Sequence, residues 1–253
     1  MSCYMVFSCA SQLFMASVVN SHLIRAFSLF SLEKADGFGH SHELILHAFI
    51  RIFSQAAMPL AASCAIIYLC VVRDYSGWKF FLSTIIHLQL NQAWIAIIIF
   101  VACLAPDYCH LITPLVSAVS GFAGGFLVPK PQMPLLYSWL FYINPTHWAY
   151  QGMGKILLSD VVFPCEVRST IECQDSTGVA ILEAFGIEKA NPYQSMFLLL
   201  VFLVVFLLTA TIVLEVRHCN VRKTLKNLRK VSIRDQYTKV IRLVIYHIND
   251  TVF

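Results

Sequence analysis

Long uncharged apolar runs constrain this sequence more than any other feature. A transmembrane helix needs about 20 consecutive, mainly apolar residues. Five runs of about that length contain no Lys, Arg, Asp or Glu: 1–24, 52–72, 80–106, 111–129 and 190–214. Charged residues make up 13% of the chain, which is about half their share in ordinary soluble domains. We therefore expect an all-α, polytopic membrane helical bundle with about five spanning helices, and the composition argues against a soluble enzyme.

A sixth apolar run, 131–154, has a different composition. It contains three prolines and six large aromatic residues: Pro131, Pro134, Pro145, Tyr137, Trp139, Phe141, Tyr142, Trp148 and Tyr150. Proline removes a backbone hydrogen-bond donor, and Trp and Tyr concentrate at the membrane–water interface. We expect a re-entrant or interfacial helical hairpin here. A sixth span is the alternative, and it would move the C-terminal tail to the other side of the membrane.

The distribution of basic residues predicts the orientation of the chain. The tail 217–253 contains nine Lys and Arg against two acidic residues, whereas the segment 130–193 contains four against six. Basic residues concentrate on the cytoplasmic flanks of spans, so the tail is expected in the cytosol and 130–193 is expected to be an outer loop. Met1 would then lie outside, with no positively charged signal segment ahead of it. On this basis we expect a fragment of a longer protein.

Two domains are expected, a partial transmembrane domain over 1–216 and a basic cytosolic tail over 217–253. In the tail, Lys223, Lys226 and Lys230 share one helical face, and apolar residues lie between and beyond the basic ones. This pattern predicts an amphipathic segment on the cytoplasmic membrane surface. A solvated tail that only fixes the topology is one alternative, and an artefact of gene prediction beyond Arg217 is another.

Uncharged polar residues inside the runs predict polar contacts within the bundle. They are Ser11, Gln12 and Asn20 in the first run and His87, Gln89, Asn91 and Gln92 in the third. Such groups are costly in hydrocarbon and face the bundle interior or a cavity, and both interhelical hydrogen bonds and a polar cavity fit them. No ladder of charged residues crosses the runs. This argues against a proton-coupled transporter or a voltage sensor and favours an apolar or amphipathic substrate.

Sequence motifs for nucleotide binding and for catalysis are not found. There is neither a GxxxxGK[ST] phosphate loop nor a GxSxG nucleophile elbow, so we expect no catalytic site in this chain. His42 and His47 imitate the HExxH zinc motif, but they are five residues apart. On a helix their side chains diverge by about 140°. We therefore expect no metal site.

Two cysteines, Cys165 and Cys173, lie in the expected outer loop. We expect a disulfide between them, which an oxidising compartment permits. Two separate thiols, or a bridge to another chain, are the alternatives.

Several segments together carry a likeness to a known family. Gly125-Phe126-Leu127 is followed by Pro134 and then by Trp139-Leu140-Phe141-Tyr142-Ile143-Asn144-Pro145. Thr177-Gly178 comes after the two outer cysteines, and Glu33-Lys34-Ala35-Asp36-Gly37-Phe38 stands between the first two runs. In this order and spacing, the segments resemble the G subfamily of ABC transporters, the White and pleiotropic-drug-resistance type.

The resemblance implies a function and a set of partners. The five runs would be helices two to six of a six-helix half, and the chain would be the substrate-pathway part of an ATP-driven exporter of lipid, sterol or xenobiotic. ATP and Mg²⁺ would bind in a nucleotide-binding domain that this chain lacks, so no cofactor is expected here. The implied partners are the lipid bilayer, a second transporter half, the nucleotide-binding domain and a hydrophobic or amphipathic substrate, with no nucleic acid. A non-transporting membrane receptor or assembly protein is the alternative.

The resemblance also implies roles for individual residues. The substrate pathway would be lined by residues of the first and fourth runs: Ser11, Gln12, Phe14, Ala118 and Gly121. An apolar plug would consist of Phe126 and Leu127, and the segment that couples to the ATPase would contain Glu33, Lys34 and Gly37.

Overall fold

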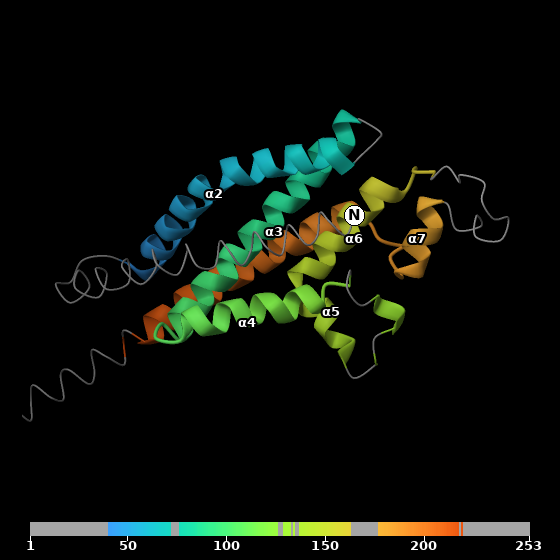
Figure 1. Ribbon diagram of the computed structural model, residues 1–253. Helices are drawn as coiled ribbons and strands as arrows, with labels where there is room; N and C mark the ends of the chain where they lie inside the picture. The colour runs from blue at the N-terminus through green and yellow to red at the C-terminus, as the bar shows by residue number, and fades with distance from the viewer. Residues whose placement is uncertain are drawn as a thin grey trace, which may run out of the picture. The chain divides into compact units, whose positions relative to one another are not determined.

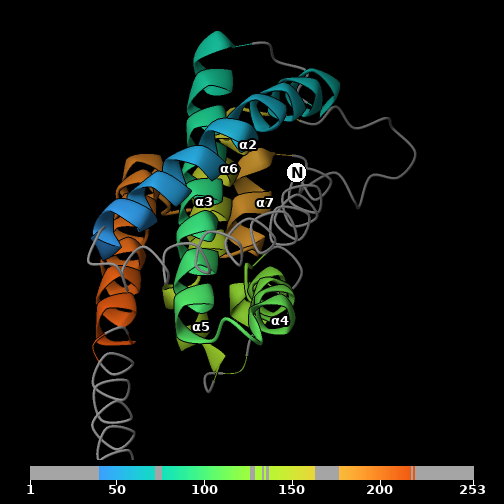
Figure 2. The ribbon, with the colours of Figure 1, turned by 90° about the vertical axis from the view of Figure 1, so that its left-hand side faces the viewer.

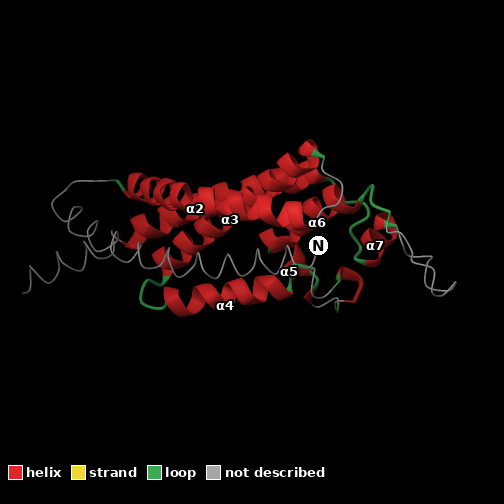
Figure 3. Ribbon diagram, turned by 45° about the horizontal axis from the view of Figure 1, so that its top comes forward, coloured by secondary structure: helices red, strands yellow, loops and turns green. Residues whose placement is uncertain are grey.

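The computed structural model describes residues 40–71, 76–125, 129–132, 134, 137–162, 177–217 and 219. Within these ranges the regular structure is helical (Figure 3), apart from one antiparallel bridge between Val162 and Thr177. The helices are α2 (Ser41–Val71), α3 (Gly77–Leu104), α4 (Cys109–Phe122), the 3-10 turn η1 (Lys130–Gln132), α5 (Trp139–Ile143), α6 (Pro145–Leu158), α7 (Gly178–Ala184) and the helix Pro192–Arg217. The described part confirms the predicted all-α class. The chain divides into two compact units, 1–211 and 212–253, and the packing below is that of the first.

Three helical segments of the described part are long and apolar enough to cross a membrane. They are Ser41–Ala62, Gly77–Leu104 and Pro192–Arg217. The second and third agree closely with the predicted runs 80–106 and 190–214. The first predicted run, 1–24, lies outside the described residues, so a total of five spans remains a prediction.

The helix α2 begins earlier than its uncharged run predicts. The run starts at residue 52, whereas the helix starts at Ser41. Its buried apolar side chains recur every three or four residues from the first turns onward: Ile45, Ala48, Ile52, Ala56 and Leu60. This spacing marks one continuous packed face. The segment that contains His42 and His47 therefore belongs to α2.

The helix α4 is shorter than the fourth apolar run, 111–129. It has 14 residues and ends at Phe122, so it is about 21 Å long, against about 30 Å for the hydrocarbon core of a bilayer. The helix ends where three small residues follow, and Gly125 adopts a φ of 92°. This left-handed conformation is easy for glycine and terminates helices. The described residues thus give α4 less than a full crossing.

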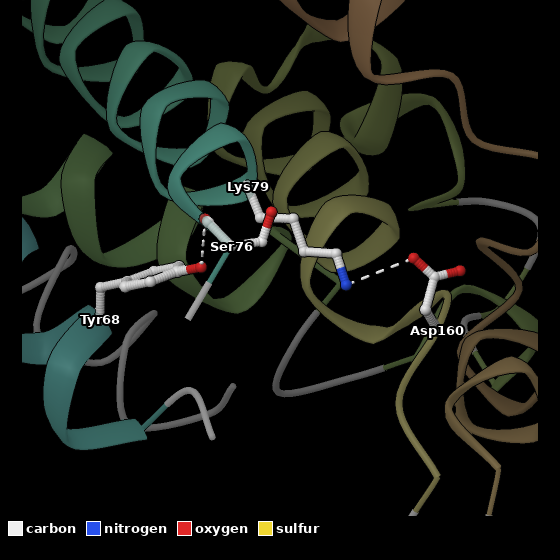
Figure 4. A network of polar contacts seen from close by, with 4 residues as sticks. All are labelled: Tyr68, Ser76, Lys79 and Asp160. Carbon is white, nitrogen blue, oxygen red and sulfur yellow. Dashed lines mark hydrogen bonds and ion pairs between the residues drawn. The ribbon is translucent and has the colours of Figure 1, made fainter. Parts of the chain in front are cut away.

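The helix α3 lies at the centre of the first unit, with α2, α4 and α6 packed around it (Figures 1 and 2). At its Gly77 end, the Tyr68 hydroxyl of α2 donates to the Ser76 carbonyl at 3.0 Å, as Figure 4 shows. The Tyr68 ring also meets Phe80 edge-on, at 5.0 Å between centroids. The end of α2 therefore lies beside the start of α3, and the two helices run antiparallel.

The predicted hairpin region, 131–154, consists of separate short helices. The helix α6 begins beside α3, where Trp94 donates to Thr146, and Asp160 just beyond its end forms an ion pair with Lys79 at 3.3 Å (Figure 4). It therefore runs antiparallel to α3, from a point well along that helix back to its Gly77 end. With 5 and 14 residues, neither α5 nor α6 is long enough to span a bilayer. The re-entrant or interfacial placement of this region remains a prediction.

Candidate functional site

A buried group of polar side chains lies where α3, the end of α4 and the start of α6 meet. We call it the junction cluster, and it consists of Trp94, Ser120, Asn144, Thr146, His147 and Gln151. Apart from the half-buried Gln151, its side chains are buried. Polar groups away from water are costly unless they are hydrogen-bonded. The hydrogen bonds within the cluster therefore offset the cost of burying these polar side chains.

Asn144 connects the two helices of the hairpin. Its backbone is extended, with φ −99° and ψ 113°, and its side-chain Oδ1 accepts from the Thr146 amide at 3.0 Å. This is the arrangement of a helix N-cap. Pro145 at the first position of α6 loses no hydrogen bond, because the first amides of a helix have no partner in the helix. The pair Asn-Pro thus ends α5 and begins α6 by local chemistry alone.

A directed chain of hydrogen bonds runs through the cluster. The indole N–H of Trp94 can only donate, and it meets the Thr146 hydroxyl at 3.3 Å. The Thr146 hydroxyl lies 3.1 Å from the Ser120 hydroxyl, which in turn donates to Asn144 Oδ1. Each hydroxyl therefore accepts one bond and donates the next. Hydrogen bonds linked in this way polarise and strengthen one another.

His147 extends the cluster to the turn that follows α4. Its Nδ1 lies 3.2 Å from the Gly124 carbonyl oxygen, which only accepts, so Nδ1 carries the proton. Its Nε2 then accepts from the Gln151 side chain at 2.9 Å. The ring also packs on Phe141 of α5, at 4.7 Å between centroids. A single imidazole thus joins α5, α6 and the turn.

Gly125 fits against this imidazole because it has no side chain. A Cβ added there would lie 3.1 Å from His147 Nδ1 and 3.6 Å from Phe141 Cε1. The positive φ of Gly125 independently disfavours any other residue. The close approach and the backbone conformation together explain a glycine at this position.

The two hydroxyls on the packed face of α4 provide a matched test of the cluster. Ser120 is hydrogen-bonded, whereas Ser117 Oγ, one turn earlier and also buried, has no partner among the described residues. We expect Ser120→Ala to destabilise the protein by about 1–3 kcal/mol, because Thr146 and Asn144 each lose a bond in a dry environment. Thermal unfolding of the two alanine variants in nanodiscs measures the difference. Ser117→Ala should be neutral or stabilising, and an equal loss in both variants would contradict this account.

The polar residues predicted within the third run lie in α3, and two of them are buried. The Asn91 side chain donates to the His87 carbonyl one turn earlier in the same helix, at 2.9 Å. Gln89 and Gln92 are half-buried, and Gln89 Oε1 is buried with no hydrogen-bond partner in the part of the chain that the structure describes. The bond between Asn91 and His87 is internal to α3, so it does not decide between interhelical bonds and a cavity.

Two of the residues proposed for the substrate pathway or plug lie in the described part, and they differ in exposure. On α4, Ala118 is exposed and Gly121 is buried. The remaining predicted residues lie outside the described residues: Ser11, Gln12, Phe14, Glu33, Lys34, Gly37, Phe126, Leu127, Cys165 and Cys173.

The junction cluster itself was not predicted from the sequence. One local signal was available, because Asn followed by Pro is a common helix start. No local sequence pattern predicts the contact between Asn144 and Ser120, since these residues are 24 positions apart.

The match to a known family covers every helix that contributes to the cluster. Residues 2–158 match the family described as ABC-2 type transporter. The chain belongs to this family. Among its relatives, the ABC multidrug transporter G of Aspergillus fumigatus is 23% identical over 127 residues, which cover 49% of this chain and 9% of that protein. The ABC transporter G family member 6 of Dictyostelium discoideum is 22% identical over 107 residues, which cover 35% of this chain and 7% of that protein.

Membership of the family confirms several expectations at a coarse level. The ABC-2 domain is a membrane domain, so the apolar helices belong to an integral membrane protein. The relative from Dictyostelium discoideum is named as a G family member, in agreement with the resemblance to G-type transporters. The aligned region is less than a tenth of the length of either relative.

Proposed function

We propose that this ABC-2 domain is the substrate-pathway part of an ATP-driven G-type exporter of lipids, sterols or xenobiotics. The observation that carries the proposal is the family match over 2–158, which includes α2 to α6 and the whole junction cluster. The two named relatives, one of which is called a multidrug transporter, support it.

The placement of charge in three of the described helices, α3, α4 and Pro192–Arg217, supports a hydrophobic or amphipathic substrate. The helix α3 carries one charged residue, Lys79, in its first turn. The helix Pro192–Arg217 carries Glu215 and Arg217 in its last turn, and α4 carries none. Charged groups inside a membrane mark ion and proton pathways. Their position at the helix ends fits a pathway for uncharged, apolar molecules.

The proposed topology places the Gly77 end of α3 on the outer side and the C-terminus in the cytosol. The ion pair between Lys79 and Asp160 brings the start of α3 and the residue just beyond α6 to one end of the bundle. In this arrangement both segments face outward, and the tail 217–253 keeps its basic residues on the cytoplasmic side. Asp160 also begins the segment that contains Cys165 and Cys173, whose disulfide remains a prediction.

The proposed partners and sites follow the G-type resemblance. A second transporter half would complete the pathway, and a nucleotide-binding domain would supply ATP hydrolysis through the segment that holds Glu33, Lys34 and Gly37. Ser11, Gln12, Phe14, Ala118 and Gly121 would line the pathway. Phe126 and Leu127 would form an apolar plug, which excludes water without charge.

The test is ATP-dependent export by the protein as the cell makes it. Inside-out vesicles from cells that express it would be given a fluorescent phospholipid, a labelled sterol and a cationic dye. We expect vanadate-sensitive uptake of at least one probe. If none is taken up although the protein is folded in the membrane, the exporter is rejected in favour of a non-transporting receptor or assembly protein.

The plug has its own matched comparison within this assay. We expect Phe126→Ala to raise basal ATP turnover or passive leak, because it opens an apolar constriction. Phe122→Ala removes the same ring from an exposed position on α4 and should leave both unchanged. Equal behaviour of the two variants would count against the plug.

A further inference from the structure

The hairpin α5–α6 is fastened to the end of α4 at two points. At the first, Asn144 exchanges two bonds with Ser120: its Oδ1 accepts from the Ser120 hydroxyl, and its Nδ2 donates to the Ser120 carbonyl at 2.8 Å. At the second, His147 donates to the Gly124 carbonyl. Two opposed bonds to one residue fix orientation as well as distance.

The two attachments bridge the segment that looks most like a hinge. Ala123, Gly124 and Gly125 follow the end of α4 at Phe122, and small residues at the end of a helix often serve as hinges. Ser120 lies before this turn and Gly124 lies within it, and both bind the hairpin. Bending at the turn would therefore have to break buried hydrogen bonds. Since these groups are away from water, nothing replaces the lost bonds.

We propose that Asn144 is a positioning residue, which locks the α5–α6 hairpin to the end of α4 so that the two move as one body during transport. The proposal rests on the exporter function proposed above. Its consequence is that the conformational change of the transport cycle occurs elsewhere than at the glycine turn. Asn144 acts on transport through the placement of α4 and makes no contact with substrate.

The variant Asn144→Ser separates the lock from the helix cap. Serine is also a good N-cap, so α6 keeps its start, but its side chain is too short to replace both bonds to Ser120. Hydrogen exchange of the whole protein in nanodiscs would be followed in the segments 115–125 and 141–150. We expect Asn144→Ser to accelerate exchange about tenfold in both segments, because one side of each broken bond is left unpaired.

The exchange experiment has controls on both sides of the lock. Ser117 lies on the same helix as Ser120, and its buried hydroxyl has no partner among the described residues. Ser117→Ala should therefore accelerate hydrogen exchange in neither segment. If Asn144→Ser fails to fold, Ser120→Ala tests the lock from α4, and it should accelerate exchange in 141–150. Acceleration confined to the mutated segment, or in neither segment, overturns the proposal.

A transport measurement distinguishes a positioning role from a purely structural one. We expect Asn144→Ser to lower the amount of substrate moved per ATP hydrolysed by at least about twofold, the lower end of mutational coupling effects, while ATP turnover is unchanged. An unchanged ratio despite faster exchange overturns the positioning role. If the unmodified protein moves no substrate, the proposed function fails, and the exchange experiment still decides whether the lock exists.

Discussion

Gly178→Ala is expected to displace α7 from the end of α6 and to destabilise the protein by about 3 kcal/mol or more. A Cβ at Gly178 would lie 1.8 Å from the Leu158 carbonyl oxygen and 3.2 Å from that of Val161. Both are backbone atoms, so no side-chain rotation relieves the overlap. The Gly178 amide also donates to the Val161 carbonyl at 2.8 Å, and the displacement would break this bond.

Thermal unfolding in nanodiscs and limited proteolysis near residue 177 measure this effect. The matched control is Gly77→Ala at the start of α3, where an added Cβ meets nothing within 4 Å. The control should be neutral or slightly stabilising, because alanine favours helix more than glycine does. Similar melting temperatures for the two variants would show that α7 does not pack on α6 as described.

Gly152→Ala is expected to loosen the contact between α3, α6 and the helix Pro192–Arg217. A Cβ at Gly152 would lie 2.9 Å from both Ile86 Cδ1 and Ser195 Cβ. The end of the Ile86 side chain can rotate, but Ser195 Cβ moves only with its helix. Overpacking of this kind costs about 1–3 kcal/mol. Thermal unfolding should show a lower melting temperature than that of the unmodified protein.

A second substitution checks that the contact with Ser195 is the cause. Ser195→Gly removes the Cβ that an alanine at position 152 would meet, so the double variant should recover part of the stability lost by Gly152→Ala. A coupling energy of this sign between neighbouring positions is what a direct clash predicts. If the stability losses of the two single variants simply add in the double variant, Gly152→Ala destabilises the protein through another contact, for instance that with Ile86.

The sequence by itself determined the class of this protein and the position of its two clearest spans. The runs 80–106 and 190–214 predicted the helices Gly77–Leu104 and Pro192–Arg217 to within a few residues. Hydrocarbon imposes this agreement, because each segment that crosses it must satisfy its own backbone hydrogen bonds and avoid charge. Each spanning segment must meet this requirement by itself, so the spans can be predicted from the sequence without knowledge of the fold. The prolines and aromatic residues of 131–154 likewise predicted a broken, non-spanning segment.

Other features depended on where the helices pack. Uncharged residues reveal where a chain tolerates lipid, but they do not reveal where a helix starts or stops. The helix α2 therefore extends to Ser41, through charged and histidine residues, and α4 ends at Phe122 within an apolar run. At the second of these ends, the turn at Gly125 lies against His147, which comes from a later helix.

The junction cluster could be recognised only from the tertiary structure. Its bonds join Trp94 to Thr146 and Ser120 to Asn144, pairs that are 52 and 24 residues apart. Each of these side chains is an ordinary polar residue in sequence. They become a connected site because the antiparallel packing of α6 on α3 brings the start of α6 to the end of α4, in an interior where an unpaired polar group is costly.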